Sequence, residues 1–153
     1  MAESPESILK KLGIELPAVA TPAANYVPSV RAGNLLFVSG QVSIWAGGRF
    51  IGKLGHDLTV EQGQQAARVC AINILANLNG SLGGLDKVRR IVKLVGFVNC
   101  TPDFNDPHKV VNGCSDLLTE VLGDRGRHAR SAVGMASLPL GAAVEAEAIV
   151  EVG

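Results

Sequence analysis

Residues 143–152 read AVEAEAIVEV, and this stretch decides the fold class. Apolar side chains occupy alternate positions, and glutamates stand at three of the positions between them. Alternation with a period of two is typical of a β-strand that buries one side and exposes the other. We therefore predict a strand over 143–152, with Glu145, Glu147 and Glu151 on the side turned away from the core.

Two upstream stretches have the spacing of amphipathic helices instead. Thr59 and Gln62 have the spacing of a capping box, and apolar residues then recur at helical intervals up to Gly80. Pro107 opens a second such stretch, which Gly123 ends. Because each helix has one apolar face, both are expected to cover the same face of a sheet.

The remaining elements are shorter. Strands are predicted over 35–38, 88–98 and 130–136, and Gly33-Asn34 is typical of a turn before the first of them. Residues 39–41 are expected to close that first strand. The turn LPLG at 138–141 predicts a hairpin that brings Glu145 near residues 132–135.

The domain organisation is expected to be simple. We predict one α/β domain over 1–153, in which 1–23 form an N-terminal extension, a capped helix over 4–12 and a Pro- and Ala-rich linker. Residues 44–54, with three glycines, predict a wide loop or a ragged edge hairpin.

Composition excludes several classes of partner. Fourteen acidic and 14 basic residues give zero net charge, and aromatic residues are only 4%, so neither nucleic acid nor a membrane surface is an expected partner. Apolar residues reach 47% and charged residues only 18%, which predicts apolar patches that a homo-oligomer covers. No signal peptide or membrane-length apolar run is evident, so a cytoplasmic location is expected.

Familiar catalytic and metal motifs are missing from the sequence. The three cysteines are widely spaced and are interpreted as small apolar core residues, without a disulfide or structural metal. The three histidines are scattered, and only His128, two residues before Arg130, merits attention. We therefore expect no metal and no organic cofactor.

Arg130 opens a run of small apolar residues, and the pattern leaves two interpretations open. The arginine is either a surface or ion-paired residue, or a forked donor for a carboxylate or phosphate held in a pocket of small residues. The glutamate row likewise is either a solvated strand face or, through Glu145, part of a cavity shared with Arg130.

Five short pieces, in order, resemble the RidA/YjgF family of reactive-intermediate deaminases, most closely its longer members. The resemblance covers about residues 24–151 and rests on these pieces: Tyr26-Val27; Gly33-Asn34 with VSGQ at 38–41; Val110-Val111-Asn112; Arg130-Ser131; and Leu138-Pro139 before Glu145-x-Glu147-Ala148.

The resemblance implies a chorismate-mutase-like α+β fold with a mixed sheet and two long helices on one face. It also implies a homotrimer with a site in each cleft between subunits. The implied activity is hydrolysis of enamines and imines to 2-oxo acids and ammonia, with a small-molecule carboxylate as the bound substrate.

The resemblance also implies roles for individual residues. Arg130 would bind the substrate carboxylate and Glu145 would activate the attacking water. The remaining implied site residues shape the pocket, the last through its backbone: Tyr26, Ser39, Asn112 and Ala132. Many members have a cysteine where this chain has Ala132.

Two other functions are weighed against deamination. The same cleft suits a non-catalytic protein that binds 2-oxo acids or other carboxylates. An endoribonuclease or translation inhibitor is the third alternative, and the neutral charge and few aromatic residues disfavour it.

Overall fold

A computed structural model describes residues 3–19 and 25–153. Ten helices and strands follow one another along these residues: α1 Pro5–Lys11, β1 Ser29–Ala32, β2 Leu35–Val42, β3 Ile44–Trp45, β4 Gly48–Arg49, α2 Val60–Leu82, β5 Val88–Asn99, α3 Pro107–Leu122, β6 Ala129–Met135 and β7 Val144–Val152. Three short 3₁₀ helices supplement them: Leu85–Lys87, Gly123–Gly126 and Pro139–Gly141.

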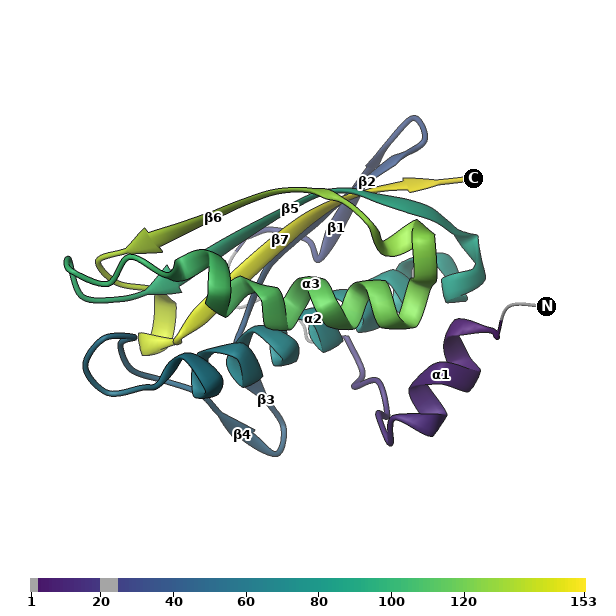
Figure 1. Ribbon diagram of the computed structural model, residues 1–153. Helices are drawn as coiled ribbons and strands as arrows, with labels where there is room; N and C mark the ends of the chain where they lie inside the picture. Colours follow the sequence, from purple (N-terminus) through teal and green to yellow (C-terminus); the bar gives the residue numbers. More distant parts are fainter. Residues whose placement is uncertain (1–2, 20–24) are drawn as a thin grey trace.

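One five-stranded sheet has the order β1-β2-β7-β5-β6. Strand β7 is antiparallel to both of its neighbours, whereas β5 and β6 run parallel. Helices α2 and α3 lie side by side against one face of this sheet (Figure 1). The predicted α+β fold, with a mixed sheet and two long helices on one face, is therefore confirmed.

The alternation predicted for the last strand is confirmed in β7. Its valines and alanines on one side are buried in the core beneath α2 and α3, from Val144 to Val152. Glu145, Glu147 and Glu151 occupy the positions between them and face away from the helices. The sheet thus has a helix-covered face and an open face, and each strand residue can be assigned to one of them.

The helix ends follow the predicted signals closely. Thr59 Oγ1 accepts a hydrogen bond from the Gln62 N–H (3.2 Å), and Gln62 Oε1 accepts one from the Thr59 N–H (2.9 Å), which completes the capping box. Helix α2 continues past Gly80 to Leu82, because the left-handed conformation that ends it occurs at Gly83 (φ 74°). Gly123 ends α3 as predicted.

Strand β2 is longer than predicted. Residues 39–41 do not close it, and it runs to Val42 through a β-bulge. Val38 pairs with Ala148 and Gln41 with Ala146, so that two residues of β2 oppose one residue of β7. A bulge lets a strand absorb an extra residue without breaking, which the run VSGQ alone does not reveal.

The predicted hairpin between the last two strands is wrong. β5 lies between β6 and β7, and the 3₁₀ helix Pro139–Gly141 carries the chain past it. The reason is that α3 forms a crossover connection between β5 and β6. The chain returns in such a way that β6 runs parallel to β5 and pairs with one edge of β5. β7 therefore pairs with the other edge of β5, where Glu145 opposes Phe97.

The N-terminal segment and the 44–54 segment flank this core. Ser4 caps α1 by accepting from the Ser7 N–H (3.1 Å), and Leu9 is buried in the common core. Strands β3 and β4 form a small separate hairpin, as one of the two predicted alternatives. Among the described residues, no helix is long and apolar enough to span a membrane.

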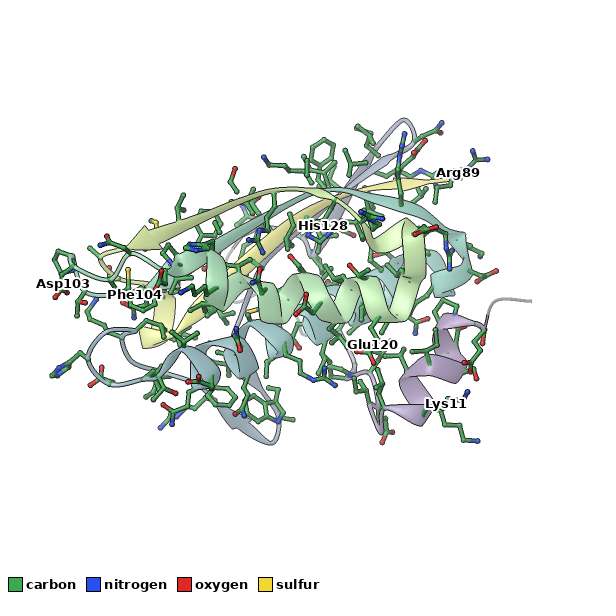
Figure 2. The ribbon with its side chains drawn as sticks, viewed as in Figure 1. Lys11, Arg89, Asp103, Phe104, Glu120 and His128 are labelled. Carbon is green, nitrogen blue, oxygen red and sulfur yellow. The ribbon has the colours of Figure 1, made fainter. Side chains whose placement is uncertain are left out.

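The close packing of α2 and α3 at Gly113 yields a stability prediction. A Cβ on Gly113 of α3 would clash with the backbone carbonyl oxygen of Gln64 in α2. Backbone cannot move aside cheaply, so Gly113→Ala is expected to lower the free energy of unfolding by about 1–3 kcal/mol. Glu120→Ala, on the exposed side of α3 (Figure 2), is the control and should change it little. Equal chemical-denaturation midpoints for both variants would contradict this packing.

Candidate functional site

The guanidinium of Arg130 is held by helix α3. Its Nη1 donates to Asn112 Oδ1 (2.8 Å) and to Ser115 Oγ (3.3 Å), and its Nη2 donates to the backbone oxygen of His108 (3.2 Å). The side chain is half-buried between β6 and α3. A guanidinium has more N–H donors than these bonds use, so its orientation is fixed while donors remain for a ligand.

His128 lies between β6 and α3 (Figure 2), and it lines the same cavity as Arg130. Its Nδ1 is 2.6 Å from the backbone oxygen of Gly126, an acceptor, so Nδ1 is the protonated nitrogen. Nε2 therefore accepts from Ser115 Oγ (2.9 Å). Burial lowers the pKa of His128, the hydrogen bond to Gly126 opposes this effect, and the positive charge of Arg130 lowers the pKa further.

These groups border a shallow cavity of about 270 Å³ at the edge of the sheet. Five residues line it: Ser115, Thr119, Arg127, His128 and Arg130. Sequence reasoning did not find Ser115, because α3 and β6 meet only in the folded chain. Only the position of His128 near Arg130 pointed to this cluster.

Glu145 belongs to a second group, on the open face of the sheet. Its carboxylate lies over Gly40 of the β2 bulge, where any Cβ would clash with Glu145 Oε2. Burial raises the pKa of Glu145, and the nearby Glu147 raises it further. A carboxyl group that holds its proton more readily is suited to both general acid and general base catalysis.

Ser39 ties the segment before β1 to this second group. Its Oγ donates to the backbone oxygen of Val27 (2.6 Å), and its N–H donates to the backbone oxygen of Pro28 (2.9 Å). These bonds hold residues 26–28 along β2, so that Tyr26, 54% exposed, lies beside the bulge. Ser39 and Glu145 therefore lie next to Gly40, and Tyr26 lines a cavity that Gly40 also borders.

The two groups are separated within one chain. Arg130 pairs with Leu94 and Glu145 with Phe97, so β5 lies between them and their Cα atoms are at least two strand spacings, roughly 10 Å, apart. Arg130 shares the helix-covered face with Ala132, which is half-buried against the core. Glu145 points to the open face. Arg130 and Glu145 therefore do not line one cavity within a single chain.

The cysteines do not take part in either group. Cys70, Cys100 and Cys114 are free and buried, in agreement with their predicted role in the core. Burial raises the pKa of the Cys114 thiol to about 12 and raises that of Cys70 as well. Such thiols are poor nucleophiles. Within residues 3–19 and 25–153, no group of three or more His, Cys, Asp or Glu side chains could hold a metal ion.

Comparison with known proteins assigns the chain to a family. Residues 6–150 match the family described as "YjgF/chorismate_mutase-like, putative endoribonuclease". The chain belongs to the YjgF/chorismate mutase-like family. "Protein TCP17" of Trypanosoma cruzi is 52% identical over 145 residues, which is 94% of this chain and 91% of that protein.

Solved structures of similar proteins share the whole fold. Atu1372 of Agrobacterium tumefaciens, a protein of unknown function, is 50% identical with a TM-score of 0.91, covering 97% of this chain and 93% of its own. A Shewanella oneidensis protein named "putative endoribonuclease" is 34% identical with a TM-score of 0.94, covering 98% and 100%. The resemblance to the YjgF family is thereby confirmed, whereas the closer similarity to its longer members stays a prediction.

The contact between Arg130 and His128 yields a titration prediction. Arg130→Ala removes a positive charge and opens the cavity to water, and both changes favour protonation of the imidazole. The pKa of His128, followed by NMR of its ring protons, is expected to rise. Arg31→Ala, which removes the same charge from the exposed strand β1, should leave it unchanged. A lower or unchanged pKa in Arg130→Ala would contradict the arrangement.

The raised pKa of Glu145 yields a second prediction. The folded chain keeps this proton at pH values where the unfolded chain has lost it, so wild-type stability should fall as pH rises through that window. Glu145→Gln cannot ionise and should gain stability relative to wild type from about pH 4 towards neutrality. Denaturation at a series of pH values measures this difference. If the free energy of unfolding of wild type instead increased relative to that of Glu145→Gln as the pH rises, the raised pKa of Glu145 would be contradicted.

Proposed function

We propose that this protein hydrolyses enamines and imines to 2-oxo acids and ammonia, in the cytoplasm, at a cleft between two subunits of a homotrimer. The observation that carries the proposal is the guanidinium of Arg130, fixed by three hydrogen bonds to α3 and with donors left for a carboxylate. The reaction and the trimer are inferred from the resemblance of this chain to the RidA/YjgF family of reactive-intermediate deaminases.

The separation of the two groups supports a site made by two chains. Arg130 lies on β6, one of the two edge strands of the sheet. Glu145 lies on the open face, where several apolar side chains are about two-fifths exposed: Phe37 (41%), Val133 (42%) and Met135 (38%). An apolar sheet face of this kind is suited to a subunit interface. Packing the β6 edge of one chain against the open face of another would bring Arg130 of the first towards Glu145 of the second.

In this composite site each group has a distinct task. One chain contributes Arg130, oriented by Asn112, and the backbone near Ala132 to hold the substrate carboxylate. The other chain contributes Glu145, which activates the water that attacks the reacting carbon. Tyr26 and Ser39 of that chain shape the pocket next to Glu145. Holding both reactants in place provides a large share of the rate enhancement in such reactions.

The reaction requires little further machinery, because the carbon of an imine is already electrophilic. Glu145 takes a proton from water as the oxygen adds to the C=N carbon. The same carboxyl group returns that proton to nitrogen, which gives a carbinolamine. The carboxylate then takes the proton of the new hydroxyl group and passes it to nitrogen as the C=O bond forms and the C–N bond breaks, so that ammonia and a 2-oxo acid are released. The raised pKa of Glu145 brings this carboxyl closer to the working pH, as acid–base catalysis requires. Neither a metal nor an organic cofactor is needed for these steps.

The deaminase assay uses 2-iminobutyrate formed in place by a dehydratase, with release of the 2-oxo acid as the signal. Wild type should accelerate release over buffer. Arg130→Ala is expected to lower kcat/KM by roughly 10²–10³-fold through loss of a charge-assisted bidentate contact. Glu145→Gln should lower kcat by roughly 10²–10⁴-fold.

Glu147→Gln is the matched control, since Glu147 lies two residues along the same face of β7, and it should retain most of the activity. No acceleration over buffer across several imines would refute the deaminase. Tm shifts with 2-oxo acids that vanish in Arg130→Ala, without turnover, would instead indicate a binding protein. RNA cleavage that persists after nuclease-free repurification would indicate the endoribonuclease named among the relatives.

A further inference from the structure

Leu140, in the 3₁₀ helix before β7, has two features that are unfavourable for a leucine. Its φ of 61° and ψ of 15° are left-handed, and among the described residues it is the only one other than glycine with a positive φ. Its side chain is also 80% exposed, the highest value among the large apolar residues that the structure describes. The first feature strains the backbone and the second leaves apolar surface in water, so neither stabilises the single chain.

The backbone on the C-terminal side of Leu140 is held by hydrogen bonds from other parts of the chain. The backbone oxygen of Gly141 accepts from the N–H of Gly52 (2.9 Å). The backbone oxygen of the buried Ala142 accepts from Asn99 Nδ2 (3.2 Å). Strain of this kind persists where the surroundings fix it, and it occurs mostly at functional sites. Glycine or asparagine would adopt this conformation with less strain, so the leucine side chain is expected to act outside the stability of its own chain.

The cavity that Leu140 borders also touches the residues next to Glu145. It has a volume of about 510 Å³, and Gly40 and Val42 of β2 line it as well. Gly40 lies against the Glu145 carboxylate, and Val42 is the residue that pairs with Glu145 in β7. The exposed side chain of Leu140 therefore borders a space adjacent to the carboxyl group proposed to activate water.

The wall of this cavity is mostly apolar. Val42, Ile44 and Trp45 contribute apolar side chains to it. Among the described residues that line it, none is an aspartate, glutamate, lysine, arginine or histidine. An ionised substrate side chain would lose its hydration here without gaining a counter-ion. An apolar side chain would instead gain from its removal from water, together with the exposed surface of Leu140.

We infer that Leu140 is a specificity-determining residue of the proposed deaminase, and that it contacts an apolar side chain of the substrate in this cavity. The preferred substrates are then imines with branched or aromatic side chains, larger than 2-iminobutyrate. The inference rests on the proposed function for its reaction, whereas the contact with Leu140 requires binding alone. Arg130 holds the carboxylate that all these substrates share, and Leu140 discriminates between their side chains.

The test compares two imines, formed in place by an amino acid oxidase from leucine and from alanine, which differ only in the apolar side chain. Wild type should have a roughly tenfold higher kcat/KM for the leucine-derived imine, as burial of the extra carbon atoms allows. Leu140→Asn has the same branched shape and tolerates the left-handed conformation, but it removes the apolar surface. It is expected to lower this ratio roughly three- to tenfold without lowering Tm. Ile51→Asn makes the same kind of change at an exposed residue that pairs with Ala142 but does not line the cavity, and it should keep the ratio.

Failure of the inference and failure of the proposed function are distinguishable. If wild type hydrolyses neither imine, the proposed function fails. The affinities of the 2-oxo acids of leucine and alanine, measured by calorimetry, then replace kcat/KM, with the same ratios expected. A wild type that does not prefer the larger ligand, or an unchanged preference in Leu140→Asn, would overturn the inference. Dissociation of the oligomer and a lower Tm in Leu140→Asn would also overturn it, because they would assign Leu140 to a contact between subunits.

Discussion

Strand β7 is bonded to β2 along one edge and to β5 along the other, and its side chains alternate strictly between the two faces of the sheet. Valine and alanine on one side form the floor on which α2 and α3 pack. This burial fixes the register, because a shift by one residue would place the glutamates in the core. Glu145 is consequently confined to the open face. Any active site that includes its carboxyl group must therefore lie on that face of the sheet.

Elements whose signals are local could be predicted from the sequence. The capping box at Thr59, the stop at Gly123 and the alternation of β7 are written in neighbouring residues, and each is present in the fold. The pairing of strands, in contrast, depends on residues that are far apart in the sequence. The turn LPLG is as compatible with a hairpin as with a 3₁₀ helix that passes over β5, and only the edge taken by β6 decides between them. The bulge at Ser39-Gly40 depends on the partner strand in the same way.

The same distinction between local and non-local signals applies to the candidate site. Arg130 and Glu145 were singled out by the residues around them and by the family resemblance. Ser115, which bonds both Arg130 and His128, carries no signal of its own in the sequence, since a serine in mid-helix is ordinary. Nor could the sequence place Arg130 and Glu145 on opposite faces of the sheet. Because of that separation, we propose a site in which each of the two residues works with a partner from another subunit.

Subunit mixing tests this claim most directly. Arg130→Ala and Glu145→Gln chains, each inactive alone, are unfolded together, refolded as a mixture and assayed for imine hydrolysis. If each cleft takes Arg130 from one chain and Glu145 from the next, random closed trimers contain intact clefts, and roughly a quarter of wild-type activity should return. Mixed oligomers, verified by mass spectrometry, that remain as inactive as either parent would contradict a site shared between chains.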